Sequence, residues 1–178
     1  MNGEPADAVA VRAWTGADAQ PTLDVFRRAV HGTARRDYSP AQLAAWAPED
    51  IALEDWAARR RESWTLVAET GGRVVGFIGL DATGCVDMLY VDPSAARTGV
   101  ASALLERVVR AAHRRGLQEL RTHASITARP FFERHGFVVV EERHPVRHGV
   151  ALTNFLMRRE LAHCPPAGRG FRRTGPRP

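Results

Sequence analysis

Apolar and polar residues alternate with a period of two in several stretches of the chain, which predicts strands. The first stretch, residues 9–14, is followed by a long region with a different period, and the alternation returns at residue 64. Thr70, Gly71 and Gly72 then interrupt it in the manner of a hairpin turn. We expect strands at residues 9–14, 64–69, 73–81, 85–91, 117–125, 137–146 and 150–161, with the last two forming a final hairpin.

Apolar residues recur every three or four positions between these strands, which predicts amphipathic helices. Thr15 or Asp18 can cap the first helix. Ser39 followed by Gln42 has the pattern of a second helix start, and Pro48 ends that helix. We expect helices at about residues 18–35, 39–48, 50–61, 99–116 and 127–136.

The order of these elements predicts the fold class. It reads β-α-α-β-β-β-α-β-α-β-β, with residues 50–61 as an additional helical segment before the second strand. Such an uneven alternation favours a mixed α/β fold (α+β) with about seven strands and helices on both faces, rather than a regular doubly wound sheet. At 178 residues, the chain has the length of one ordinary domain.

The charges are unevenly distributed. All 25 basic residues are arginine, against 20 acidic residues, which gives a net charge of +5. Residues 163–178 hold four of these arginines and no acid, so the rest of the chain is close to neutral, and nucleic-acid binding is not expected. Because this tail is rich in Pro, Gly and Arg, we expect it to be disordered and residues 1–162 to form the domain.

Several other classes of site are not indicated. Cys85 and Cys164 fit neither a disulfide framework nor a zinc-ligand spacing, and His144 and His148 lack further ligands, so no metal site is expected. No apolar run is long enough to span a membrane. The first residues lack the pattern of a secretory signal, so we expect a cytoplasmic protein.

The stretch from Tyr90 to Leu105, YVDPSAARTGVASALL, joins an expected strand to an expected helix through a turn of small residues. A helix start of this kind presents unpaired backbone N–H groups and the positive end of the helix dipole, which together accept phosphate. Gly99 lets the backbone approach an anion closely, and Arg97 can add charge. Alternatively, Gly99 only provides a positive φ for the turn. The turn alone leaves both interpretations open.

The same stretch resembles the acyl-CoA-binding motif of the GNAT superfamily of N-acyltransferases, Q/R-x-x-G-x-G/A after a strand that ends in L-Y-V-x-P. Gly99, Val100 and Ala101 match the last part of this motif. The Gln/Arg position is occupied by Ala96, and Arg97 lies one place later. Backbone N–H groups, with Arg97, would then hold the anion in place of a conventional Gln or Arg.

A second segment is similar to a later GNAT segment. Residues 125–137, SITARPFFERHGF, follow N-x-x-A-x-x-F-Y-E-x-x-G-F, with Ser125 at the Asn position and Phe132 at the Tyr position. Residues 34–48 and 149–161 resemble a bacterial subgroup, the YafP-like proteins. Two motifs in the expected order, with the expected elements between them, imply the GNAT fold.

The resemblance covers about residues 9–161 and implies an enzyme. GNAT proteins transfer an acyl group from a CoA thioester to an amine by direct attack. We therefore expect an N-acetyltransferase with acetyl-CoA as cosubstrate and a primary amine of a small molecule or a peptide as acceptor. A second copy of the chain, in a homodimer, is also considered as a partner.

The resemblance also implies where the cosubstrate binds. The backbone from Arg97 to Ser102 is expected to hold the pyrophosphate, and main-chain N–H groups from Leu89 to Val91 are expected to polarise the thioester carbonyl. The expected cosubstrate-binding residues are Leu89, Tyr90, Val91, Arg97, Thr98, Gly99, Val100, Ala101, Ser102, Ser125 and Phe132.

Three residues are candidates for proton transfer. Asp87 is the carboxylate nearest to the expected thioester, and His123 has an ordinary pKa that suits general-base work, so both are candidate bases. The usual GNAT proton donor is a Tyr, but that position is Phe132, which leaves Tyr38 as a candidate donor or substrate contact. Ser125, Thr127 or water can instead protonate the thiolate, since an ordinary thiol pKa near 8.5 makes strong acid assistance less necessary.

Other hypotheses remain at this stage. Because Ala96 and Phe132 both depart from the GNAT pattern, a non-catalytic acyl-CoA-binding module is the alternative to an enzyme. The arginines at residues 59–61 are typical of a solvated helix end and can also attract an acidic substrate.

Overall fold

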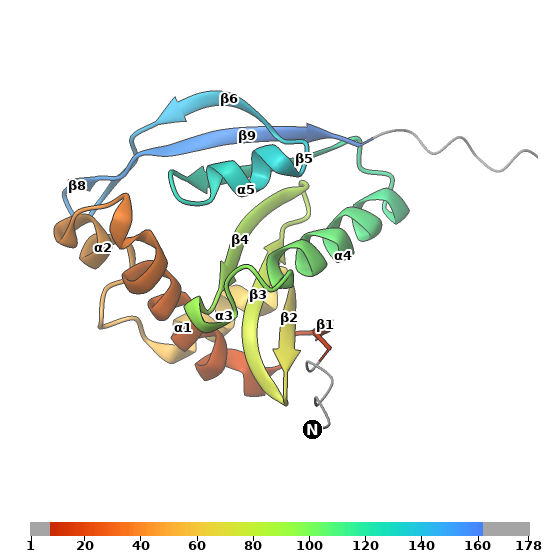
Figure 1. Ribbon diagram of the computed structural model, residues 1–178, viewed down its shortest axis with the longest axis horizontal. Helices are drawn as coiled ribbons and strands as arrows, with labels where there is room; N and C mark the ends of the chain where they lie inside the picture. Colours follow the sequence, from red (N-terminus) through yellow and green to blue (C-terminus); the bar gives the residue numbers. More distant parts are fainter. Residues whose placement is uncertain (1–7, 162–178) are drawn as a thin grey trace, which may run out of the picture.

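A computed structural model describes residues 8–161, so the tail and Cys164 lie outside the described residues. Its main feature is a seven-stranded sheet in the order β1-β2-β3-β4-β5-β9-β6, in which only β4 and β5 are parallel (Figure 1). The strands are β1 (Ala10–Ala13), β2 (Trp64–Thr70), β3 (Arg73–Leu80), β4 (Cys85–Val91), β5 (Glu119–Ser125), β6 (Val138–Arg143) and β9 (Asn154–Glu160). The predicted mixed sheet of about seven strands is confirmed.

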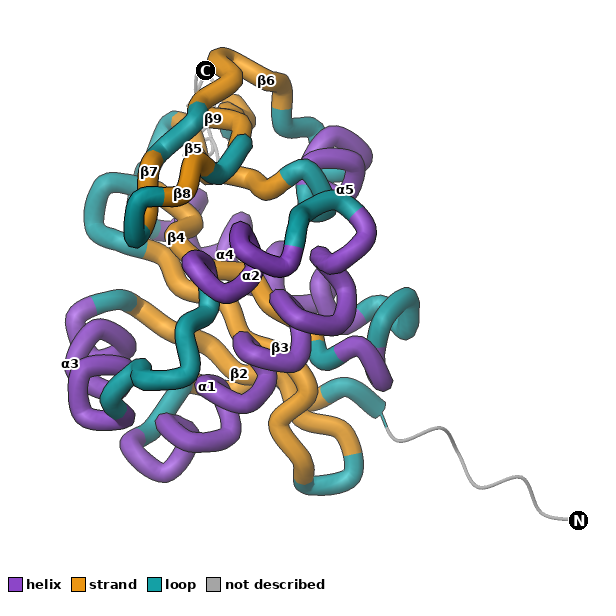
Figure 2. The backbone as a smooth tube through the Cα atoms, turned by 90° about the vertical axis from the view of Figure 1, so that its left-hand side faces the viewer, coloured by secondary structure: helices purple, strands orange, loops and turns teal. Residues whose placement is uncertain are grey.

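Helices cover both faces of the sheet, as predicted. One apolar core packs α1 and its neighbours on the strand residues Val67, Val74 and Phe77, and the other packs α4 and α5 on Leu66 and Ile78 (Figure 2). The helices are α1 (Ala19–Arg28), continued by a π-helical turn (Ala29–Thr33) and a 3-10 turn (Ala34–Arg36), then α2 (Pro40–Trp46), α3 (Leu53–Glu62), α4 (Val100–Arg114) and α5 (Arg129–Arg134). None of the helices between residues 8 and 161 is long and apolar enough to cross a membrane.

The helix ends follow the local sequence. Ser39 and Gln42 form the expected capping box of α2, with Pro40 at its first position. In α4, the residues that recur at helical spacing are buried, among them Leu104 and Val108 at 0 % exposure. The helix ends before Gly116, whose φ of 70° lies in the left-handed region that glycine favours.

The final hairpin pairs β6 with β9, but its connection contains an additional small ribbon. The expected strand over residues 137–146 ends at Arg143, and β7 (Val146–Arg147) pairs instead with β8 (Val150–Ala151). Pro145 lacks the N–H that a continuing ladder needs. The turn residues His148 and Gly149 both have positive φ, which reverses the chain tightly. The β7–β8 ribbon packs near α2, where Gln42 Nε2 donates to the Ala151 carbonyl at 3.0 Å.

The parallel strands β4 and β5 diverge soon after they begin. Only Cys85 with Arg121 and Val86 with Thr122 are paired, and the remainder of β4 turns away from β5 (Figure 1). The Thr122 hydroxyl donates to the Val86 carbonyl at 2.9 Å at the last of these pairs. The sheet is therefore open in its middle from Asp87 onwards, and this opening positions the candidate site.

Candidate active site

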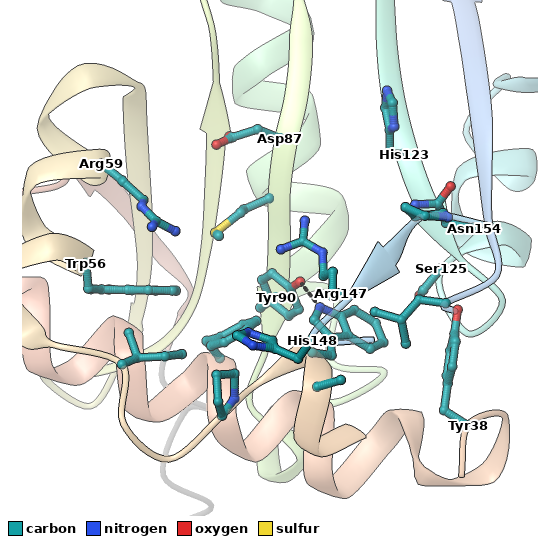
Figure 3. A pocket seen from close by; sticks show the side chains of 18 of the residues that line it. Tyr38, Trp56, Arg59, Asp87, Tyr90, His123, Ser125, Arg147, His148 and Asn154 are labelled. Carbon is teal, nitrogen blue, oxygen red and sulfur yellow. Dashed lines mark hydrogen bonds between the residues drawn. The ribbon is translucent and has the colours of Figure 1, made fainter. Parts of the chain in front are cut away.

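Two cavities flank the opening between β4 and β5. The ribbon-side cavity, about 570 Å³, is bordered by α2, α3, β4, β5 and the β7–β8 ribbon (Figure 3). The α4-side cavity, about 680 Å³, is bordered by the π-helical turn after α1, the end of β4, the start of α4, and α5. Trp46, Tyr90 and Ser125 line both cavities, so the two cavities adjoin at these residues.

The α4-side cavity is built around the N-terminus of α4. Gly99 caps this helix with a φ of 87°, and Arg97 also has a positive φ of 64°. The N–H groups of the first helical turn have no intrahelical partners, so the turn presents donors and the positive end of the helix dipole. The expected cosubstrate-binding residues that line this cavity are Leu89, Tyr90, Val91, Arg97, Gly99, Val100, Ala101, Ser102 and Ser125.

Two of the expected cosubstrate-binding residues lie elsewhere. The Thr98 hydroxyl donates to the Ala95 carbonyl at 2.8 Å, and Thr98 does not line the cavity. Phe132 is only 2 % exposed because its ring packs between those of Phe131 and Phe137 in the core. Phe131, its neighbour, lines the cavity instead. The sequence similarity thus identified the segment, whereas the turn of the short helix α5 decides which aromatic ring faces the cavity.

Arg134 and His135, which sequence reasoning missed, complete this wall of the cavity. His135 Nδ1 lies 2.8 Å from the Phe131 carbonyl oxygen, which can only accept, so Nδ1 carries a hydrogen and donates it. The other ring nitrogen, Nε2, is hydrogen-bonded to the Ser102 hydroxyl at 3.1 Å. The only sequence signal for these residues was their place just before Gly136 in the second motif.

The backbone of β4 supplies donors to the opening. The Asp92 N–H donates to the Val75 carbonyl at 2.8 Å. Tyr90, two residues before Asp92 on β4, pairs with Phe77 on β3. Because N–H directions alternate along an antiparallel ladder, Tyr90 bonds toward β3 while Leu89 and Val91 direct their N–H groups to the other side. On that side β5 has already diverged, so these two groups face the opening.

Asp87 projects into the ribbon-side cavity from an irregularity in β4. Gly79 pairs with Met88 and Leu80 pairs with Val86, so Asp87 is the extra residue of a β-bulge. Its carboxylate lies over Gly79, where an added Cβ would overlap Oδ1. Asp87 Oδ2 is 3.5 Å from Arg60 Nη2, and burial lowers the pKa of this arginine, whose side chain is 2 % exposed. Arg60 is thus a buried partner of the candidate base that sequence reasoning missed.

His123 lines the same cavity from β5, across the gap from Asp87. Figure 3 shows the Asp87 carboxylate directed toward α3 and the His123 ring extending along β5, so the two side chains do not point toward one another. Partial burial, together with Arg143 and Arg121, holds the pKa of His123 below its ordinary value of 6.5. The imidazole is therefore neutral near pH 7 and can accept a proton.

The Tyr38 hydroxyl bridges two loops beside the cavity. It donates to the Thr153 carbonyl at 2.5 Å and accepts from the Ile126 N–H at 2.9 Å. Tyr38 is 6 % exposed, and burial raises its pKa. The hydrogen of the Tyr38 hydroxyl is thus already donated to a carbonyl, and the hydroxyl links the end of β5 to the start of β9.

Tyr90 and Trp46 form the wall between the cavities. Trp46 Nε1 donates to the Tyr90 hydroxyl at 3.2 Å, and the Tyr90 ring stacks on Phe77 with centroids 5.6 Å apart. Burial raises the pKa of Tyr90 to about 12, so its phenol remains protonated.

In residues 8–161, no three His, Cys, Asp or Glu side chains gather as metal ligands would.

The acetyltransferase (GNAT) domain family matches residues 34–159, which is most of the chain. The chain belongs to the GNAT family. The uncharacterized N-acetyltransferase YafP of Escherichia coli K12 is 39 % identical over 155 residues, which cover 87 % of this chain and 98 % of that protein. The predicted family is therefore confirmed, and acetyl-CoA is the cosubstrate of GNAT acetyl transfer.

Solved GNAT structures share the fold. A GCN5-related N-acetyltransferase from Rhodopseudomonas palustris is 31 % identical, with a TM-score of 0.84 over 89 % of this chain and 100 % of that chain. The PaiA N-acetyltransferase from Thermoplasma acidophilum, solved with coenzyme A, is 19 % identical, with a TM-score of 0.72 over 86 % of this chain and 99 % of that chain. The second likeness supports the fold alone.

Proposed function

We propose that this GNAT protein transfers an acetyl group from acetyl-CoA to a primary amine of a small molecule or peptide by direct attack. The observation that carries the proposal is that two cavities of different chemistry adjoin at Trp46, Tyr90 and Ser125. The α4-side cavity has a helix N-terminus suited to phosphate, and the ribbon-side cavity has the Asp87 carboxylate of β4. We propose that a thioester bound where the cavities adjoin meets an amine from the ribbon side.

The α4-side cavity fits the cosubstrate. Gly99 has no side chain, and no described atom lies within 4 Å of where its Cβ would be, so a phosphate can approach the backbone there. Arg97 and Arg134 line the same cavity and add positive charge. The N–H groups of Leu89 and Val91 are the proposed donors to the thioester oxygen, where negative charge develops as the amine attacks.

Asp87 is the proposed base, with His123 as a second candidate on the facing strand. The amine must lose a proton to attack, and a positioned base contributes about 10² to 10⁴ in rate. Asp87 projects into the ribbon-side cavity from the bulge beside the opening, and we propose that it takes the proton through a water molecule. His123 is neutral near pH 7 because of its lowered pKa, so it can also accept the proton.

Ser125 is the proposed proton donor to the departing thiolate. Its hydroxyl oxygen accepts the Ala128 N–H at 3.0 Å and the residue borders both cavities. Among the described residues, no acceptor holds its hydroxyl hydrogen. Phe132 is buried, and the hydroxyl hydrogens of Tyr38 and Thr127 are donated to the Thr153 carbonyl and the Asp37 carboxylate, so Ser125 or water remains for this step.

The test of the proposed function is release of free CoA thiol from acetyl-CoA in the presence of a panel of primary amines. We expect thiol release well above the rate of hydrolysis without amine, together with an N-acetylated product detected by mass spectrometry. Tight acetyl-CoA binding without turnover on any amine would instead support a non-catalytic acyl-CoA-binding module.

Gly99→Val is expected to weaken CoA binding about tenfold or more. A β-branched residue is strained at a φ of 87°, and its side chain would occupy the space through which phosphate approaches the helix start. Gly116→Val is the matched control, because Gly116 has a similar φ of 70° at the other end of α4 and lines neither cavity. Calorimetric titration with CoA would contradict the assignment if the two variants bound it equally well.

Gly79→Ala is expected to lower kcat by about tenfold with little change in CoA affinity. The new Cβ would overlap Asp87 Oδ1 and displace the carboxylate from its place in the bulge. The loss should vanish in an Asp87→Asn background, since the two changes then affect one group. Additive losses in that double-mutant cycle would show that Gly79 acts independently of Asp87.

A further inference from the structure

Two arginines of the ribbon-side cavity are unpaired among the residues that the structure describes. Arg59 lies on α3 and Arg147 on β7, and both line the cavity. Figure 3 shows both guanidinium groups directed into it from different walls. In the part of the chain that the structure describes, neither takes part in an ion pair or a side-chain hydrogen bond, unlike Arg60, which is engaged by Asp87 and Met88.

No acidic side chain of the cavity forms an ion pair with either arginine. Asp87 is paired with Arg60. Asp55 lies in the first turn of α3, where a carboxylate stabilises the positive end of the helix, and Asp50 lies just before that helix. Neither of them forms an ion pair with another described residue. In the run of arginines at residues 59–61, Arg60 is therefore the buried partner of the candidate base Asp87, whereas Arg59 is an unpaired cation that lines the cavity.

Part of the remaining wall of the cavity is apolar or aromatic, and part of it is polar. Phe26, Trp46, Trp56, Tyr90 and Met88 form the first part, with Trp46 and Tyr90 at the border to the α4-side cavity, and His123, Ser125, His148, Thr153 and Asn154 are among the polar residues. A guanidinium binds a carboxylate or phosphate through two parallel hydrogen bonds, and such bonds are strongest where water is partly excluded. Arg147 lies on β7 of the β7–β8 ribbon, which interrupts the final hairpin. This ribbon therefore places a positive charge beside the cavity.

We propose that the acceptor is a primary amine that also carries an anionic group, carboxylate or phosphate, which Arg59 and Arg147 bind while the amine faces Asp87. This inference rests on the proposed function for its site but not for its test, because anion binding is measurable without turnover. With either anionic group, the proposed acceptor is a small zwitterionic amine with an apolar or aromatic body.

The experiment compares matched pairs of probes on the full chain in the presence of CoA. One pair is an aromatic α-amino acid and its carboxamide, and the other is a phosphorylated amino alcohol and its unphosphorylated parent. Calorimetry with CoA bound measures the affinity of each probe, and thiol release from acetyl-CoA, supplied in place of CoA, measures kcat/KM where turnover occurs. The two pairs distinguish carboxylate from phosphate as the recognised group.

We expect tighter binding of the anionic member of one pair, and we expect Arg147→Ala or Arg59→Ala to weaken it about 10- to 100-fold. The neutral member should change less than threefold, and Arg147→Lys should restore part of the affinity. Comparing variant with wild type for each probe cancels the different intrinsic reactivities of the amines. Arg110→Ala, an exposed arginine on α4 that lines neither cavity, is the matched control.

Equal affinity for the two members of each pair, or equal loss for both members in the arginine variants, would overturn the inference. Preference for an acceptor with a second positive charge would also overturn it and would assign recognition to Asp50 and Asp55. If anionic amines bind through the arginines but no amine is acetylated, the inference stands and the proposed function fails. If only neutral amines are acetylated, the inference fails and the proposed function stands.

Discussion

Asp87→Asn should lower kcat for acetyl transfer by about 10² to 10⁴ while changing the affinity for CoA less than threefold. The amide keeps the shape of the side chain in the bulge but does not accept a proton from the amine. Asp87 lines only the ribbon-side cavity, so the binding of cosubstrate on the α4 side should not change. Steady-state kinetics with saturating amine, combined with CoA titration, measures the two quantities separately.

The comparison of Asp87→Asn with His123→Ala decides between the two candidate bases. If His123 is the base, its replacement should remove a fall in kcat/KM at acidic pH, centred below pH 6.5 because its pKa is lowered. A loss of less than threefold in both variants would exclude both residues. Asp24→Asn, on α1 and outside both cavities, controls for the loss of one carboxylate.

Because Asp87 also pairs with the buried Arg60, its replacement leaves a less compensated buried cation. The thermal unfolding of Asp87→Asn should therefore be followed beside its kinetics. A variant that retains CoA affinity and a cooperative unfolding transition is folded, and its loss of kcat then reflects chemistry. Loss of both CoA affinity and cooperative unfolding would assign Asp87 mainly to structure.

Much of the fold was predictable because its elements are locally encoded. The stripe that includes Leu104 and Val108 identifies α4, and the Ser39–Gln42 pattern identifies the start of α2. The turn before α4, where we propose that the cosubstrate binds, was predictable for the same reason, since a helix start and its turn are contiguous in sequence. Gly99, at the centre of that turn, has a positive φ, as one of the two interpretations of this glycine required.

The acceptor side was less predictable because it is assembled from distant segments. Arg60 meets Asp87 only because α3 packs beside β4, and no periodicity in either segment indicates that pairing. The bulge that directs Asp87 depends on the register between β3 and β4. Arg147 reaches the cavity because the strand β6 ends before Pro145 and a separate short ribbon follows. The alternation of residues alone predicted a continuous strand over residues 137–146.

Gly76 shows how close packing in the core sets the position of the cosubstrate site. A Cβ added there would lie 2.9 Å from Val100 Cγ1, 3.1 Å from the Tyr90 carbonyl oxygen and 3.3 Å from Leu104 Cδ1. Two of these atoms belong to the first turns of α4, and the third belongs to the backbone of β4. The absence of a side chain on β3 therefore lets the start of α4 lie against the strand whose N–H groups face the opening.

Gly76→Ala should destabilise the protein by about 1–3 kcal/mol and also weaken CoA binding. The β-branched Val100 and the β4 backbone cannot rotate away, so α4 must shift from β3 and carry its N-terminus with it. Chemical denaturation measures the first effect and calorimetric titration of CoA the second. Gly16→Ala is the control, because the nearest atom to its added Cβ is 3.9 Å away. Destabilisation with unchanged CoA affinity would mean that strain at Gly76 is absorbed within the core, and that the position of the α4 N-terminus does not depend on this contact.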